Sequence, residues 1–156
     1  NSLKITAENL CLSLKNKNIK VVRISNLFGD NFTNQAYILP TLIRDSINKK
    51  KINLEISKNS TKDFIHVYDA FNILVKVITR GRKRLYNIAS GRNIKINEIL
   101  KVIKKITNCK IHYKKSLKTI KEPEINISRI RKEFDFNAKF SLVNSINELI
   151  TNYKKN

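Results

Sequence analysis

The chain has 156 residues, enough for one ordinary domain, and 41% of them are hydrophobic, so we expect a folded chain. No apolar run reaches the roughly 18 residues of a membrane-spanning helix. Lys and Arg number 32 against 12 Asp and Glu, a formal net charge of +20, which raises the question of a nucleic-acid partner. The lysines are scattered, however, and no aromatic residues interleave with them. We therefore expect solvated helix faces that attract anionic ligands, with nucleic acid as the less favoured alternative.

The sequence offers little for a metal centre. Its two cysteines, Cys11 and Cys109, and its two histidines, His66 and His112, do not combine at metal-ligand spacing. We therefore expect no metal site, two free thiols in a reducing cytoplasm, and a packed imidazole at His66.

The first half of the chain alternates between helical and extended patterns of apolar residues. The elements predicted for it are an amphipathic helix over residues 2–16, a strand over 20–24, a loop over 25–33, a helix over 37–47, a strand over 52–56 and a short strand over 64–67. Asp69 then precedes apolar residues at helical spacing, so we expect it to cap the N-terminus of a buried helix over 70–78.

The second half continues the alternation. Gly81 is expected to end the buried helix, and Asn97 is expected to open a later one. The other elements predicted for this half are a strand over 85–89, a turn at 90–91, a strand over 110–113, a surface loop over 114–123, and closing helices over 127–134 and 142–153. Strands that alternate with helices predict the α/β class, and no repeat or linker divides residues 1–156 into separate domains.

Several short segments match one protein family, in the family's order. Lys4 followed by Ala7-Glu8 resembles the end of a catalytic signature in which a Tyr stands four residues before the Lys. The other matching segments are Val21–Gly29, Leu39-Pro40, Lys62–Ala70, which reads Lys-Asp-Phe-Ile-His-Val-Tyr-Asp-Ala, Tyr86–Gly91, and the closing pair Arg129–Phe136 and Ser141-Leu142. Chance matches would not keep their order over about 140 residues. The sequence is therefore similar to the extended short-chain dehydrogenase/reductase family of NAD-dependent nucleotide-sugar epimerases and dehydratases.

The resemblance covers nearly the whole chain, but only the C-terminal half of such an enzyme. It implies the C-terminal part of a Rossmann-like NAD(P)-binding fold, with residues 1–30 ending that part. Residues 31–156 are expected to form mainly the small α/β substrate-binding subdomain and the closing helices. Glycines stand only at 29, 81 and 91, so the glycine-rich loop that holds the pyrophosphate of NAD(P) has no counterpart. We therefore expect a fragment or a truncated gene product, inactive alone, whose first helix and first strand expose apolar surface.

Hydride exchange at a sugar carbon requires a proton to leave the hydroxyl, and the family uses a Tyr as the base. The resemblance implies that Lys4 is catalytic, because its ammonium stabilises the phenolate and so lowers the pKa of that Tyr. It also implies that Lys4 binds the ribose of NAD or NADP, and that Ile24 lines the cofactor pocket near the nicotinamide. A solvated Lys4 on an exposed helix face is the alternative interpretation.

The resemblance places three residues where the family binds the diphosphate of its substrate: Asn26, Lys62 and Asn87. Asn26 follows a strand end, where α/β sheets bind ligands. Lys62 stands for the family's Arg and keeps the charge without the bidentate geometry. Tyr68 for Asp and Ala89 for Gly are further departures. The alternatives are a solvated Lys62 and two Asn side chains that satisfy local backbone groups.

The resemblance thus implies part of an NAD(P)-dependent nucleotide-sugar epimerase, dehydratase or reductase that serves surface polysaccharide biosynthesis. One alternative is a catalytically inactive domain that binds a nucleotide sugar or a partner. A second and less favoured alternative is a basic module that binds nucleic acid. The expected small-molecule partner is a nucleotide-diphosphate sugar, and a homodimer through residues 2–16 is an open alternative to a monomer. The type of reaction, the sugar, and the choice between NAD and NADP stay open, because the family sets them in its other half.

Overall fold

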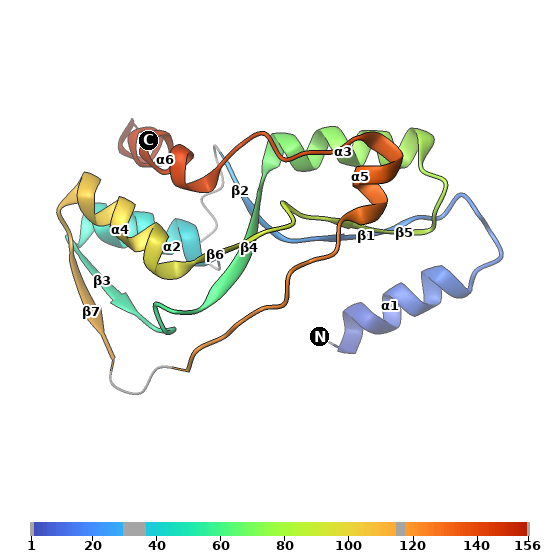
Figure 1. The fold of residues 1–156 in the computed structure, drawn as a ribbon. Helices are drawn as coiled ribbons and strands as arrows, with labels where there is room; N and C mark the ends of the chain where they lie inside the picture. Colours follow the sequence, from blue (N-terminus) through green and yellow to red (C-terminus); the bar gives the residue numbers. More distant parts are fainter. Residues whose placement is uncertain (1, 30–36, 115–117, 156) are drawn as a thin grey trace.

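The computed structural model describes residues 2–29, 37–114 and 118–155, and Figure 1 shows how their helices and strands are arranged. In chain order the elements are α1 (Ser2–Ser13), β1 (Val21–Ile24), β2 (Asn26–Phe28), α2 (Ile38–Asn48), β3 (Lys51–Leu54), β4 (Thr61–His66), α3 (Val67–Arg80), β5 (Leu85–Ile88), β6 (Asn93–Lys95), α4 (Ile96–Thr107), β7 (Lys110–Tyr113), α5 (Ser128–Phe134) and α6 (Leu142–Lys155). The predicted α/β class is confirmed, because helices alternate with strands that pair mainly in parallel.

The strands form three small sheets. Strand β1 pairs in parallel with β5, β3 pairs in parallel with β7, and β4 lies between parallel β2 and antiparallel β6. Residues 21–28 form one extended run that is interrupted only at Ser25, where the run exchanges its neighbour β5 for β4. The Ser25 amide still donates to the carbonyl of Ile88, at 3.0 Å. We call this point, where β5 departs and β4 joins, the strand fork.

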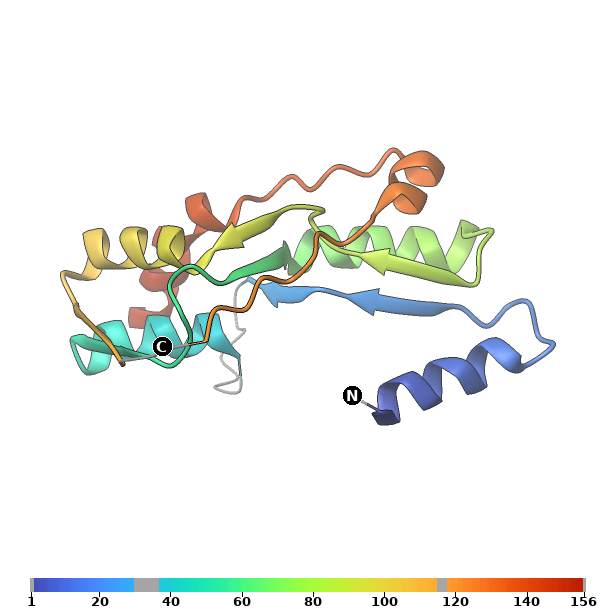
Figure 2. The same cartoon turned by 60° about the horizontal axis from the view of Figure 1, so that its bottom comes forward.

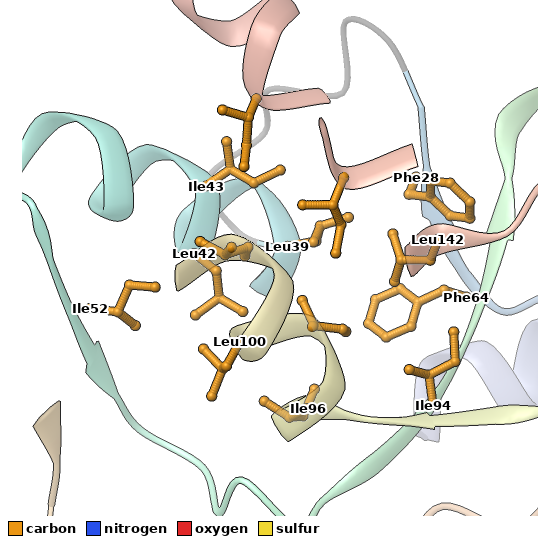
Figure 3. Close-up of a cluster of buried hydrophobic side chains, with 14 of the residues drawn as sticks. Phe28, Leu39, Leu42, Ile43, Ile52, Phe64, Ile94, Ile96, Leu100 and Leu142 are labelled. Atoms are coloured by element: carbon orange, nitrogen blue, oxygen red, sulfur yellow. The ribbon is translucent and has the colours of Figure 1, made fainter. Parts of the chain in front are cut away.

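The larger hydrophobic core lies at one end of the molecule, where α2, α4 and α6 gather in Figure 1. Helix α4 contributes to this core because its buried residues recur at helical spacing and so form one apolar face. They are Ile96, Ile99, Leu100, Ile103 and Thr107. Figure 3 shows the side chains of α2 and α4 directed toward one another, with Phe64 of β4 and Leu142 of α6 closing the cluster.

A smaller core lies at the other end, between the β1–β5 pair and helices α3 and α5. Tyr86 of β5 is its largest fully buried side chain. Its hydroxyl donates to the carboxylate of Glu133 and accepts from the Lys83 amide, each at 2.8 Å. Burial of the phenol raises the pKa of Tyr86 above its ordinary value of 10.0, because the charged form loses its hydration.

Helix α1 belongs to neither core. It runs beside β1 in both Figures 1 and 2, apart from the other helices, and none of its residues is buried. Leu3 is 85% exposed and Leu10 is 62% exposed. The predicted helix is confirmed, although it ends at Ser13, and so is the expectation that it exposes apolar surface. Contacts with the β1–β5 pair hold it: Arg84 donates to the carbonyl of Leu12 at 2.6 Å and Arg23 pairs with Glu8.

Two expected helix starts are wrong. The side chain of His66 caps α3 by accepting from the Tyr68 amide at 3.2 Å, so the helix begins three residues earlier than expected. Asp69 is instead buried in the first turn, where its carboxylate accepts from the amides of Lys139 and Phe140. Helix α4 begins at Ile96 rather than at Asn97. Asp69 therefore does not cap the helix, because its carboxylate is engaged by residues about 70 positions further along the chain.

Two short strands were also missed. The predicted loop over 25–33 contains β2, and β6 lies where a connection was expected; each has three residues. Residues 30–33 of that loop, and residues 115–117 of the predicted surface loop, lie outside the described part of the chain. The expected strand at 110–113 and both closing helices are confirmed.

Candidate functional site

Lys4 lies on α1 one helical turn before Glu8, so the two residues share a face of the helix. Glu8 reaches the β1–β5 pair, because it accepts from Arg23 Nε at 2.9 Å. This hydrogen bond lowers the pKa of Glu8 and raises that of Arg23. Since α1 runs antiparallel to β1, the turn that carries Lys4 lies toward the carboxyl end of β1 (Figures 1 and 2).

Ile24 is the last residue of β1, and its side chain is 44% exposed. Strand β1 is hydrogen-bonded to β5 on one side only among the described strands. An exposed β-branched side chain beside an unpaired strand edge forms a surface on which another chain segment can pack. Lys4 and Ile24 thus flank the same end of β1, although no contact joins them in the described structure.

Asn26 follows the strand fork as the first residue of β2. Its Nδ2 donates to the backbone carbonyl of Asp63 on β4, at 2.8 Å. The side chain is therefore fixed by the neighbouring strand, while its amide oxygen and the second N–H of its NH₂ group are left for other partners. This hydrogen bond matches the alternative interpretation, in which the Asn side chain satisfies a local backbone group. It occupies only one of the two N–H groups of the amide.

Lys62 lies on β4, paired in register with Ile94 of β6. Its ammonium contacts the carboxylate of Glu122, and its side chain is largely buried. It is therefore not a solvated lysine. The Glu122 carboxylate occupies the Lys62 ammonium, for which the family resemblance implies a phosphate as the partner. Both anions can accept hydrogen bonds from an ammonium.

Asn87 lies on β5 opposite Arg23 of β1. Its Nδ2 donates to the carbonyl of Asn126, at 3.0 Å. Both side chains line a cavity of about 210 Å³ whose other walls are Leu85, Asn126, Ser128 and Arg129. A neutral amide beside two guanidinium groups makes this cavity suitable for an anion.

Residues 121–126 connect two of the predicted substrate positions. Glu122 contacts Lys62, and Asn126 accepts from Asn87. The segment is also fastened to β6, since Asn93 Nδ2 donates to the carbonyl of Glu122. The other amide atom of Asn93, Oδ1, is buried and has no hydrogen-bond partner in the described structure. Sequence reasoning missed this segment, because its partners lie about 30 to 60 residues away along the chain.

In the sequence, Asp63 belongs to the Lys-Asp-Phe run, where it is expected at most to orient the neighbouring loop and has no chemical role. The structure buries its carboxylate at the strand fork, where it accepts hydrogen bonds from Ser25, Ser90, Gly91 and Arg92. Ser25 precedes Asn26, and Ser90 follows Asn87 by three residues. The three predicted substrate residues therefore come from segments that meet at one buried carboxylate.

Two other features bear on the chemistry. His66 is buried, as expected, with its ring stacked on Phe140 at a centroid distance of 4.1 Å. Among residues 2–29, 37–114 and 118–155, no group of three or more His, Cys, Asp or Glu side chains could hold a metal ion. Within the same ranges, no helix combines the length and the apolar character needed to cross a membrane.

The model of the NAD dependent epimerase/dehydratase family matches residues 2–89, which is more than half of the chain. Among curated proteins, CDP-abequose synthase of Salmonella muenchen is 20% identical over 137 residues, covering 83% of this chain and 46% of the relative. The chain thus spans about half the length of the curated relative that it matches.

Solved structures agree on the fold. TunA, an NAD-dependent NDP-hexosamine 5,6-dehydratase of tunicamycin biosynthesis, superimposes with a TM-score of 0.84 at 14% identity, covering 97% of this chain and 50% of TunA. The dTDP-glucose 4,6-dehydratase of Bacillus anthracis, in complex with NAD, gives a TM-score of 0.82 at 22% identity, covering 99% of this chain and 50% of that enzyme. These structures confirm the expected Rossmann-like α/β fold, and the chain spans half the length of each. By its match to the family model, the chain belongs to the NAD-dependent epimerase/dehydratase family.

Proposed function

We propose that the chain is the substrate-binding half of an NAD(P)-dependent nucleotide-sugar epimerase, dehydratase or reductase, and that it serves surface polysaccharide biosynthesis. The observation that carries the proposal is that the chain segments of Asn26, Lys62 and Asn87 are joined through the buried carboxylate of Asp63 at the strand fork. Two amides and an ammonium from separate segments suit a diphosphate, which needs several donors that converge on it. The two free cysteines support the reducing cytoplasm as its compartment.

On this proposal, the diphosphate takes the place of the Glu122 carboxylate on Lys62. The ammonium gives up one anion and receives another, so its buried charge stays paired throughout. The second N–H of the Asn26 amide and the cavity beside Asn87 then complete the set of groups around the diphosphate. Residues 121–126 must shift for the exchange, because the segment is fastened at both Lys62 and Asn87.

The chain's own residues fit only one side of the cofactor. Lys4 and Ile24 flank the carboxyl end of β1, which suits the nicotinamide and its ribose. The three glycines supply no pyrophosphate loop, since Gly81 ends α3 and the other two lie in turns. A nicotinamide held there would supply the hydride acceptor for chemistry at a sugar carbon. The role of Lys4 is to hold a neighbouring phenol in its charged form, so that the sugar hydroxyl can lose its proton.

The open edge of β1 and the exposed face of α1 are the surfaces that the rest of such an enzyme covers in this proposal. We expect turnover only when a further part of the sheet, with its glycine-rich loop, covers them. A homodimer through residues 2–16 is the competing use of the same face. Sedimentation of the chain at two concentrations separates them: Leu3→Glu keeps a dimer from forming, whereas Ile78→Glu, on the exposed face of α3, leaves it intact.

Calorimetric titration tests the substrate assignment. The chain is titrated with UDP-glucose, with dTDP-glucose and with NAD at moderate salt. We expect a nucleotide sugar to bind without NAD, and Lys62→Ala to weaken that binding about tenfold or more, since a charged hydrogen bond is lost. Lys101→Ala, which removes one positive charge from the exposed face of α4, is the matched control. A folded chain that binds no nucleotide sugar contradicts the proposal.

A second candidate is a domain that binds a nucleotide sugar or a partner without turnover. The pairing of Lys62 with Glu122 favours it, because the cation that replaces the family's Arg is already neutralised. Lys4→Ala distinguishes the two candidates in an enzyme assembled with a chain that carries the glycine-rich loop. Turnover falls by orders of magnitude if the site is catalytic, while binding of the nucleotide sugar persists in either case.

A further inference from the structure

We propose that Asp63 is a positioning residue, whose buried carboxylate fixes the three predicted diphosphate-binding segments relative to one another. The inference rests on the proposed function, because it concerns the same site. Asp63 itself touches no substrate in this proposal. It acts through Asn26, Lys62 and Asn87, which lie on the segments that it joins.

The carboxylate is surrounded by donors. Its Oδ1 accepts from the Ser25 hydroxyl at 2.7 Å and from the Ser90 amide at 3.0 Å. Its Oδ2 accepts from the Ser90 hydroxyl at 2.9 Å, the Gly91 amide at 2.8 Å and the Arg92 amide at 3.1 Å. Asp63 is 1% exposed, so water does not compete for these bonds.

The donors come from two segments far from Asp63 in the sequence. Ser25 is the residue at which the extended run leaves β5 for β4. Ser90, Gly91 and Arg92 form the turn that leads from β5 into β6, and Gly91 has a φ of +78°, in the left-handed region. Three successive amides in such a turn make a concave anion site, which the carboxylate fills.

The two donor segments and the strand of Asp63 itself each carry one predicted substrate residue near this carboxylate. Asn26 follows Ser25, Lys62 precedes Asp63, and Asn87 lies on β5 just before the turn. Asn26 also donates to the backbone carbonyl of Asp63 itself. A displacement of the carboxylate therefore moves the side chains that the diphosphate must meet, and a diphosphate site depends on such fixed geometry.

The charge of Asp63 is held by dipoles. Among the ion pairs of the described residues, none includes this carboxylate. Asp63→Asn keeps the shape of the side chain but turns one acceptor into a donor. Whichever way the amide lies, its NH₂ faces at least one backbone N–H of the turn, so a donor is left without an acceptor.

Asp69 provides a matched control. It is also buried, its carboxylate accepts from the amides of Lys139 and Phe140 at 2.9 and 3.1 Å, and it lies on α3, away from the strand fork. Both bonds end on Oδ2, so the amide oxygen of Asp69→Asn can keep them, and the variant removes a buried carboxylate charge as Asp63→Asn does. Only the Asp63 variant is expected to disturb the substrate positions.

The first readout needs no ligand. We expect Asp63→Asn to shift the NMR signals of the side-chain amides of Asn26 and Asn87, and to speed hydrogen exchange at Gly91 and Arg92. Asp69→Asn leaves these signals in place. Unchanged signals in Asp63→Asn overturn the inference. Ser25→Ala, which removes one hydroxyl donor and keeps the carboxylate, repeats the test if Asp63→Asn does not fold.

The second readout is the affinity for UDP-glucose, measured by calorimetry at a temperature where both variants are folded. We expect Asp63→Asn to bind about tenfold more weakly, while Asp69→Asn binds as the unmodified chain does. An equal loss in both variants overturns the inference, because a general loss of stability then explains it. If the unmodified chain binds no nucleotide sugar, the proposed function fails, and the NMR comparison still decides whether Asp63 positions the three segments.

Discussion

Helices α1 and α4 each have 12 residues and each carry several Leu and Ile side chains, yet α4 buries five residues and α1 buries none. Leu100 of α4 is 1% exposed, whereas Leu10 of α1 is 62% exposed. Helix α4 meets α2 and α6 in the larger core, while α1 lies beside β1 with its apolar face uncovered by the described chain (Figure 2). Apolar side chains on a helix thus indicate that another surface packs against them, but not that the same chain provides that surface.

The largest effect is expected from one substitution made on both helices. Leu100→Ala lowers the free energy of unfolding by about 2–5 kcal/mol, because it leaves a cavity in the larger core. Leu10→Ala lowers it by less than about 0.5 kcal/mol, since the side chain is already in water. Urea denaturation at low protein concentration measures both values. A comparable loss from Leu10→Ala would show that α1 has a covering partner in solution, and would end the comparison.

The attachment of α1 is tested by Arg84→Ala. The guanidinium donates to the carbonyls of Cys11 and Leu12 at the end of α1, so its loss frees the helix from the β1–β5 pair. We expect amide hydrogen exchange in α1 to speed up about tenfold, or about 1.4 kcal/mol of local stability, while α4 stays protected. Arg82→Ala, which removes an exposed guanidinium nearby, is the control. Equal protection of α1 in both variants argues against anchoring by Arg84.

An alkaline titration tests how much the buried Tyr86 hydroxyl contributes to the stability of the smaller core. Because burial raises the pKa of Tyr86 in the folded chain, the unfolded chain loses this proton first as pH rises above 10.0. The stability that Tyr86 contributes is therefore complete below pH 10 and declines above it. The difference in melting temperature between the unmodified chain and Tyr86→Phe shrinks over that range, and Tyr153→Phe on α6 serves as control. A constant difference contradicts the assignment.

The smallest effect concerns the ion pair that joins α1 to β1. The Arg23 hydrogen bond lowers the pKa of Glu8 below its ordinary value of 4.5, so the pair stabilises the chain above that pH. Its contribution is lost as pH falls through the lowered pKa. Titration of the Glu8 carboxylate by NMR measures the shift, and Arg23→Gln abolishes it. Because the pair lies at the surface, added salt reduces the shift, and a shift insensitive to salt would contradict this account.

Sequence patterns predicted most of the helices and the longer strands, because burial imposes a period on them. They missed β2 and β6, since three residues carry no period and these strands are defined by their pairing with β4. They also assigned the cap of α3 to Asp69. That carboxylate instead serves the chain near Phe140, about 70 residues away, and no local pattern reports such a partner.

The candidate site was predictable only in part. The family resemblance named Asn26, Lys62 and Asn87, and the structure brings their segments together at the strand fork. It did not name Asp63 or Glu122, whose roles depend on hydrogen bonds and an ion pair between distant segments. Lys4 and Ile24 lie at one end of β1 (Figure 2), and their cofactor roles stay predictions.

The carboxylate of Asp69 has one more consequence, because the chain that it holds joins the two cores. Residues of the smaller core end at Ala138, whereas the larger core needs Leu142, Ile146 and Ile150 of α6. A chain that leaves the ribosome from its N-terminus can therefore complete the smaller core first. The larger core must wait for α6, and Asp69 then fixes the crossing between the two cores.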